Sequence, residues 1–162
     1  MNKVLVIATH PDDETLGCGG ALLRHMQNKD KIFWLIMTKM SDTKIWNKKS
    51  IMLRDKEIKS VSKAYKFKKI YNLGFETIKL DTYPINKVTK KLSEVVNNCK
   101  PNIIYCPNET DVHTDHQITY KACRILGKSF RFPFIKKILS YEVLSETDSN
   151  FFEKKLFKPN YF

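Results

Sequence analysis

Glycine and proline are scarce in this sequence, with 5 glycines and 6 prolines among 162 residues. Collagen-like, linker-rich and low-complexity chains contain many more of both, so the composition excludes those classes. The hydrophobic fraction is 42%, which is enough apolar side chain for a core, and the length is that of one ordinary domain. We therefore expect a single globular domain over residues 1–162.

Cysteine pairs and long apolar runs are also missing. The four cysteines lie far apart and form no C-x-x-C spacing, so we interpret them as reduced, mostly buried thiols. No signal peptide precedes the first apolar segment, and no apolar run approaches the roughly 20 residues that cross a bilayer. These absences predict a cytoplasmic protein without a transmembrane segment.

The charge is strongly unbalanced, with 29 Lys and Arg against 17 Asp and Glu and a net charge of +12. An excess of this size is compatible with nucleic acid, an anionic membrane or an anionic substrate as partner. The basic residues are nearly all lysines, scattered over predicted helix faces and loops and not interleaved with exposed aromatics. We interpret them as a solvated surface and expect no nucleic-acid partner.

Apolar runs typical of buried strands alternate with helical periodicities along the chain. The expected strands are residues 3–8, 32–38, 70–73, 103–106 and 138–144, and the expected helices are residues 15–28, 49–65, 85–99 and 117–127. This alternation predicts an α/β fold, a mainly parallel sheet covered by helices on both faces in three layers. Right-handed crossovers favour the strand order 3-2-1-4-5, with a topological switch between strands one and four.

A polar cluster, His10-Pro11-Asp12-Asp13-Glu14, directly follows the first strand. An ionised carboxylate that is buried without a partner is very costly, so we expect these side chains to face water, a cation or a ligand. A turn that leads into a helix N-terminus explains one or two of the acids by capping and by the helix dipole. It does not explain the histidine beside them.

A second polar cluster, residues 108–116, follows the fourth strand. If strands one and four are neighbours, both clusters lie at the carboxyl edge of the sheet, where open α/β folds bind ligands. Together they offer three imidazoles and three carboxylates: His10, Asp12, Asp13, His113, Asp115 and His116. Two histidines and one carboxylate with a position left for water form a catalytic zinc set, so the sequence predicts a metal site with acids to spare.

These motifs resemble those of the PIG-L/LmbE family of zinc-dependent N-deacetylases. The resemblance rests on His10-Pro11-Asp12-Asp13-Glu14, on Gly17-Cys18-Gly19-Gly20 and on His113-Thr114-Asp115-His116, and it extends to Arg54-x-x-Glu57, Leu73-Gly74-Phe75 and Tyr141-Glu142. It implies a Rossmann-like fold and a Zn²⁺ cofactor. It also implies an enzyme that removes the acetyl group from an N-acetylated amino sugar or its conjugate, such as an N-acetylglucosaminyl compound.

By motif position, the resemblance implies that His10, Asp13 and His116 are the zinc ligands and that Asp12 is the general base. Elementary chemistry agrees with this division. An amide is a poor electrophile, so zinc must polarise its carbonyl and lower the pKa of a bound water. Because Asp13 cannot bind the metal and also take the proton freely, the neighbouring Asp12 is the natural base.

Three further roles follow from the same resemblance. A protonated His113 would steady the oxyanion or protonate the leaving amine, and Asp115 would orient a histidine. Arg54 matches a position associated with substrate contact, although a simple surface pair with Glu57 explains it equally well. Outside the motifs, we expect His25 to be solvated on a helix flank.

Several alternatives stay open. One is a zinc-dependent deacylase of a non-sugar N-acyl compound, and another is an inactive metal-binding relative. A nucleotide- or nucleic-acid-binding module is disfavoured, because the turn after the first strand has acids in place of a G-x-G-x-x-G phosphate cradle. Since members of the family generally continue with a further helix beyond the equivalent of residue 162, a C-terminally truncated domain and a naturally short member are both compatible with the sequence.

Overall fold

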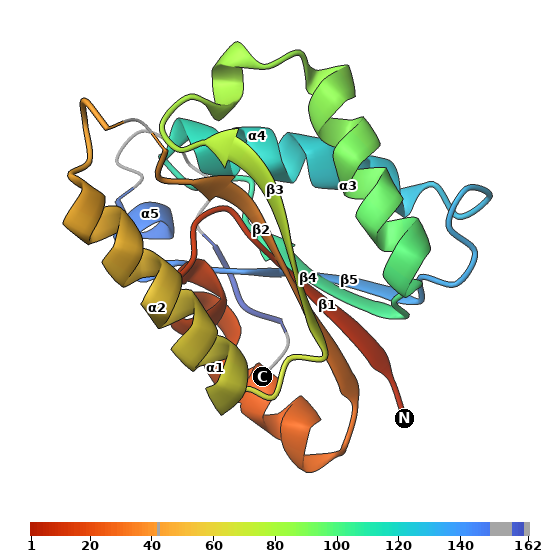
Figure 1. Cartoon of the computed structure of the whole chain (residues 1–162). Helices are drawn as coiled ribbons and strands as arrows, with labels where there is room; N and C mark the ends of the chain where they lie inside the picture. Colours follow the sequence, from red (N-terminus) through yellow and green to blue (C-terminus); the bar gives the residue numbers. More distant parts are fainter. Residues whose placement is uncertain (42, 150–156, 161–162) are drawn as a thin grey trace.

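A five-stranded parallel sheet forms the centre of the protein (Figure 1). The computed structural model describes residues 1–41, 43–149 and 157–160. The strands are β1 (Lys3–Ala8), β2 (Lys31–Lys39), β3 (Lys69–Glu76), β4 (Ile103–Pro107) and β5 (Lys137–Tyr141). They pair in the order β3-β2-β1-β4-β5, and every neighbouring pair is parallel. The predicted α/β class and strand order are confirmed.

Helices cover both faces of this sheet (Figure 1). The longer ones are α1 (Asp13–Gln27), α2 (Lys48–Ala64), α3 (Ile85–Cys99) and α4 (Thr114–Cys123), and the short ones are η1 (Leu80–Thr82), η2 (Arg124–Gly127) and α5 (Leu144–Thr147). Successive side chains of β1 point to opposite faces. Leu5 and Ile7 join the core under α3 and α4, whereas Val4 and Val6 join the core under α1. The protein therefore has the predicted three layers.

Several element boundaries differ from the prediction: β5 ends at Tyr141 and not at residue 144, and the start of the fourth helix and the length of β3 also differ. The fourth helix begins at Thr114, three residues earlier than expected, because the Nδ1 of His113 accepts a hydrogen bond from the Asp115 amide and caps the first turn. This cap places Asp115 and His116 on the helix itself. β3 is also longer than predicted, and it continues through Gly74, whose φ of 68° is a left-handed conformation that glycine adopts without strain.

The start of α1 packs tightly against the end of β5. A Cβ atom at Gly17 would overlap the ring of Tyr141, and the Tyr141 hydroxyl donates to the Ile7 carbonyl over 2.8 Å. The close approach of α1 to β5 therefore requires a glycine at Gly17, whereas a Cβ atom at Gly20 would meet no described neighbour within 4 Å. The contact at Gly17 fixes the N-terminus of α1 beside the end of β1.

The four cysteines are all unpaired and buried, as predicted. Among the residues that the structure describes, no helix combines the length and apolar character needed to span a membrane.

Candidate metal centre

The two polar clusters meet because β1 and β4 are neighbours in the sheet. After β1, the Asp12 and Asp13 amides both donate to the His10 carbonyl and form a tight turn. The Asp13 carboxylate then accepts a hydrogen bond from the His10 amide over 2.8 Å. This turn holds the Asp13 side chain against the histidine three residues before it, at the carboxyl edge of the sheet.

The side chains of His10, Asp13 and His116 converge at this edge. His10 Nδ1 lies 3.2 Å from His116 Nε2, and His116 Nε2 lies 3.4 Å from a carboxylate oxygen of Asp13. One ligand atom from each of the three residues falls within 4.8 Å of the other two. The structure thus brings together side chains from segments more than 100 residues apart, at the place where the strand order puts both clusters.

A buried aspartate, Asp111, fixes the orientation of His116. Its carboxylate accepts a hydrogen bond from His116 Nδ1 over 2.8 Å, and its other oxygen accepts from the Thr147 hydroxyl over 2.7 Å. Both Asp111 and His116 are almost completely buried. Because the Nδ1 carries the proton in this arrangement, the lone pair of His116 is on Nε2, the atom that faces His10. Sequence reasoning did not single out Asp111.

Asp115 holds His10 in the same manner. His10 Nε2 lies 3.1 Å from the Asp115 carboxylate, which also accepts from the Ile78 and Leu80 amides over 2.7 and 2.9 Å. Burial alone would raise the pKa of Asp115, but the hydrogen bonds from His10 and from the two amides outweigh it and lower the pKa. The histidine that Asp115 orients is thus His10, with its Nδ1 lone pair directed at His116.

The arrangement fits a divalent cation. Two imidazole lone pairs that face each other across 3.2 Å, with a carboxylate oxygen beside them, repel one another unless a proton or a cation lies between them. Two histidine nitrogens and one carboxylate oxygen, each histidine backed by a buried carboxylate, form the donor set of a catalytic zinc site. His10, Asp13 and His116 are therefore able to hold such an ion with coordination positions to spare.

Without a cation, Asp13 and His116 each bind a proton more readily than they do in water. Burial raises the pKa of Asp13, and the neighbouring His116 and His10 only partly oppose this. Burial tends to lower the pKa of His116, but the hydrogen bond to Asp111 and the Asp13 charge outweigh it, so this pKa is also raised. A proton and a metal ion therefore compete for the same pair of side chains.

A second group of potential ligands shares His10 and adds His113 and Asp115. It is a poorer cation site, because the Asp115 oxygens are already used by His10 and by the Ile78 and Leu80 amides. His113 packs edge-on against His10, with 4.7 Å between the ring centroids. Its Nδ1 accepts from the Asp115 amide, so its remaining proton lies on Nε2.

The surroundings of His113 bear on the protonated form expected from the sequence, which stays a prediction. Burial and the nearby His10 lower the pKa of His113 below its ordinary value, despite the opposing charge of Asp115. Neutral His113 keeps one N–H group, on Nε2, and can donate a hydrogen bond without carrying a charge.

Asp12 and Arg54 lie at the solvent side of the site. The Asp12 side chain is 48% exposed, and one of its oxygens lies 3.4 Å from Nη1 of Arg54. The same Nη1 donates to the Pro11 carbonyl over 2.8 Å, and Nε lies 3.5 Å from the Glu57 carboxylate. Arg54 thus pairs with Glu57 as the simpler interpretation had it, but it also supports the turn that carries Asp12. It borders a cavity of about 300 Å³ together with Pro11.

Glu14 departs from the prediction that every acid of the first cluster faces water, a cation or a ligand. Its side chain is fully buried, one oxygen accepts from the Thr15 hydroxyl over 2.6 Å, and within the described part of the chain the other oxygen has no hydrogen-bond partner. Burial raises the pKa of Glu14 to about 7. The carboxyl can enter the core because it can hold a proton there, which lowers the cost of burial.

His25 is also not solvated as expected. Its Nδ1 lies 2.8 Å from the Asp30 carboxylate, its Nε2 lies 3.0 Å from the Tyr105 hydroxyl, and only 12% of its side chain is exposed. Tyr105 is 80 residues away in the sequence, so helix periodicity could not reveal this contact.

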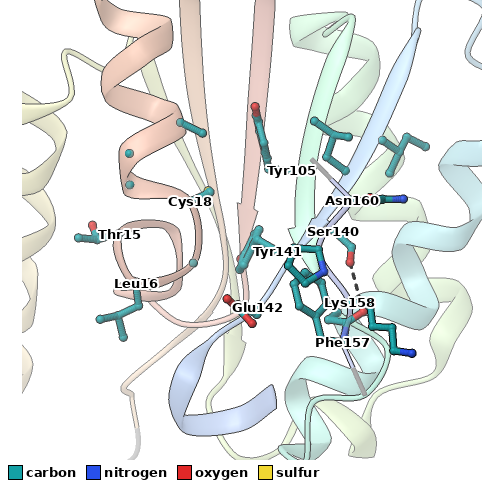
Figure 2. Close-up of a pocket in the computed structure, with 18 of the residues that line it drawn as sticks. Thr15, Leu16, Cys18, Tyr105, Ser140, Tyr141, Glu142, Phe157, Lys158 and Asn160 are labelled. Atoms are coloured by element: carbon teal, nitrogen blue, oxygen red, sulfur yellow. Dashed lines mark hydrogen bonds between the residues drawn. The ribbon is translucent and has the colours of Figure 1, made fainter. Parts of the chain in front are cut away.

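A much larger cavity lies elsewhere, along α1, β4 and β5 (Figure 2). Its volume is about 1620 Å³, and its wall includes Tyr105, Ser140 and the segment Phe157 to Asn160. Among the described residues, neither the two histidines nor the aspartate of the candidate metal centre lines it. A choice of functional site by cavity volume alone would therefore select this cavity and not the candidate metal centre.

Comparison with known proteins identifies several relatives. The family model PIG-L, described as GlcNAc-PI de-N-acetylase, matches residues 5–126. The protein "Uncharacterized deacetylase YaiS" of Escherichia coli (strain K12) is 26% identical over 147 residues, which are 88% of this chain and 74% of that protein. The family match covers both polar clusters.

Solved structures share the fold. The conserved protein TT1542 from Thermus thermophilus has a TM-score of 0.73 at 24% identity, over 99% of this chain and 70% of that one. The N,N'-diacetylchitobiose deacetylase from Pyrococcus horikoshii has a TM-score of 0.66 at 25% identity, over 75% of this chain and 48% of that one. This chain therefore matches about half the length of the Pyrococcus protein.

Proposed function

Because this chain belongs to the PIG-L family, a family of deacetylases, we propose that it is a metal-dependent hydrolase that removes the acetyl group from an N-acetylated amino sugar or its conjugate. The observation that carries the metal part of the proposal is the pair of histidine lone pairs that face each other beside the Asp13 carboxylate. Such a set of acceptors calls for a cation.

His10, Asp13 and His116 would hold the ion, which we propose to be Zn²⁺. A zinc ion bound there would polarise the amide carbonyl and lower the pKa of a water molecule. Asp111 and Asp115 keep the two imidazoles in the tautomers that leave Nε2 of His116 and Nδ1 of His10 free for the ion.

Asp12 is the proposed general base. It neighbours the ligand Asp13 in the chain, yet its side chain is 48% exposed, whereas Asp13 is buried against His116. Asp12 is therefore free to accept the proton of the attacking water and then to pass it to the departing nitrogen, which leaves acetate and a free amine. Arg54 holds the turn through the Pro11 carbonyl and so helps to place this carboxylate.

His113 is the proposed stabiliser of the transition state. Its Nδ1 is occupied by the Asp115 amide, so Nε2–H is available to donate to the amide oxygen as negative charge develops on it. In this role the neutral ring acts as a hydrogen-bond donor, and Asp12 supplies the proton for the amine. This assignment replaces the imidazolium that the sequence suggested.

The sugar-type substrate is supported by the relatives and by the position of Arg54. The Pyrococcus relative is a diacetylchitobiose deacetylase, and the family description names a GlcNAc-containing compound. Arg54 borders the cavity of about 300 Å³, which Pro11 also lines, and a substrate hydroxyl group there could accept from its guanidinium. We also propose a cytoplasmic location, in keeping with the four unpaired thiols.

The test is a metal determination combined with an acetate-release assay on a panel of N-acetylated sugars and N-acyl amino acids. We expect about one zinc per chain and activity on the sugars. Asp12→Ala should keep the metal and lose turnover, whereas Asp81→Ala, an exposed acid of η1, should behave as the parent protein. Release only from N-acyl amino acids would favour the non-sugar deacylase, and a metal-loaded protein without any activity would favour the inactive relative.

A further inference from the structure

The outer face of α2 carries a row of lysines and exposed apolar side chains. α2 has no fully buried residue and rests on the sheet through Ile58 and Val61. Residues at helical spacing on the opposite side form one row: Lys49, Met52, Lys56, Lys59 and Lys63. Figure 1 shows α2 at the left edge of the molecule, in front of α1. We call this row, together with Leu53, the α2 surface.

The α2 surface is unusual in two respects. Met52 is 62% exposed and Leu53 is 54% exposed, and Ile45 in the segment just before the helix is 53% exposed. Large apolar side chains that cluster on a surface often mark a site of contact. The lysines of the row also repel one another at these spacings, and among the described residues none of them forms an ion pair.

The acids of α2 do not balance this charge. The helix contains six basic and two acidic residues. Of the two acids, Glu57 is already paired with Arg54, which points inward, towards the turn of Asp12. The outward face is therefore cationic as well as partly apolar.

We propose that the α2 surface binds the surface of an anionic phospholipid bilayer. The lysine ammonium groups would lie among the headgroup phosphates, and Met52 and Leu53 would enter the boundary between headgroups and acyl chains. Cationic side chains next to protruding apolar ones are complementary to such a boundary, which is anionic at the outside and apolar just below. Each lysine near an anionic membrane surface contributes separately to the affinity.

A nucleic acid is a poorer match for the same surface. Exposed Met52, Leu53 and Ile45 have no favourable contact with a phosphate backbone, and the row contains lysines without an arginine to form bidentate base contacts. Single-stranded nucleic acids would further require aromatic side chains on which bases stack, and the row contains none.

The geometry leaves the metal centre intact when this surface is occupied. Arg54 and the outward row lie on opposite sides of one helix, so changes in the row do not remove a contact of the site. The inference concerns binding alone and does not depend on the proposed deacetylase activity.

The test is sedimentation of the full chain with vesicles of phosphatidylcholine, with or without phosphatidylglycerol. We expect binding only to the vesicles that contain phosphatidylglycerol. The triple variant Lys56→Gln, Lys59→Gln, Lys63→Gln should weaken binding by about a hundredfold, because each lysine contributes about fivefold. The double variant Met52→Ser, Leu53→Ser should remove the binding that persists at high salt.

A matched control loses the same charge on the other side of the sheet: Lys90→Gln, Lys121→Gln, Lys128→Gln. It should bind as the parent protein does, and circular dichroism should show that all variants fold. The proposal would be overturned if the two triple variants lost the same amount of vesicle binding. It would also be overturned if the parent protein bound neutral and anionic vesicles equally, or bound neither kind. Binding to duplex DNA that depends on the α2 lysines but not on Met52 and Leu53 would instead identify a nucleic-acid surface and overturn it as well.

Discussion

Two histidine–aspartate pairs occur at opposite ends of the sheet, and they differ in one respect. His116 and Asp111 at the carboxyl end, and His25 and Asp30 at the amino end, both have an Nδ1 to carboxylate distance of 2.8 Å. The Nε2 of His25 meets the Tyr105 hydroxyl, which satisfies it. The Nε2 of His116 faces the lone pair of His10 and the Asp13 carboxylate. The feature that marks His116 as a proposed metal ligand is therefore what its Nε2 faces, and not the aspartate that contacts its Nδ1.

The most direct test of this difference between the two pairs is to replace each histidine with alanine in turn. His116→Ala deletes one of three proposed ligands, so zinc affinity should fall by well over the roughly 100-fold limit seen for outer-shell changes. His25→Ala should leave zinc affinity unchanged. Competition with a chromogenic chelator measures both, and equal affinities in the two variants would contradict the assignment of the site.

The buried carboxyl group of Glu14 should give the next largest effect. Glu14 has its pKa raised to about 7 in the folded protein, against an ordinary value of 4.5. A carboxyl that holds its proton more tightly when folded stabilises the protein at low pH and loses this contribution as pH rises through the folded pKa. In metal-free protein Glu14 alone should therefore lower the free energy of unfolding by about 3 kcal/mol between pH 4.5 and pH 7, in addition to the loss from Asp13 and His116, whose pKa values are also raised.

Glu14→Gln should reduce the slope of this part of the profile, because an amide cannot titrate, whereas Asp13 and His116 still do. Urea unfolding followed by circular dichroism at a series of pH values measures the effect. A profile that keeps the same slope in the variant would show that another group causes it.

The aspartates that contact the Nδ1 atoms of the two histidines, Asp111 and Asp30, allow a comparison with smaller expected effects. Asp111→Asn should let the His116 ring adopt the other tautomer and weaken zinc binding by about 10–100-fold, or roughly 1.4–2.7 kcal/mol. Asp30→Asn makes the same chemical change behind His25 and should not alter zinc affinity. If both changes weaken the metal equally, the effect comes from loss of fold and not from the orientation of His116.

The smallest expected effect lies at the amino end. Tyr105→Phe removes the hydroxyl that pairs with His25 and should cost about 1 kcal/mol of stability, the usual net value of one hydrogen bond. Zinc content and turnover should stay at the level of the parent protein. Thermal unfolding monitored in parallel with the chelator assay checks both, and a loss of zinc would link the two ends of the sheet.

The strand order and the meeting of the two polar clusters could be predicted, because parallel βαβ units obey strict connection rules and carry their ligand groups after the strands. The burial of Trp34 agrees with the apolar strand predicted over residues 32–38. These features depend on short-range patterns and on topology, both of which can be read from a sequence.

The partners of individual polar groups could not be predicted in this way. Asp111 stands five residues before His116, a spacing without meaning until the helix is known to begin at Thr114. His25 was misjudged because its partner Tyr105 comes from β4. Glu14 was misjudged because charge patterns do not reveal which carboxyl is able to keep its proton.

Thr147 links α5 to the candidate metal centre. Its hydroxyl donates to Asp111 and accepts from the Val143 amide, so a short helix that contributes no ligand determines how one imidazole is turned. If His116 binds a metal ion as proposed, substitutions in α5 would alter the affinity for that ion without replacing any of the three proposed ligands.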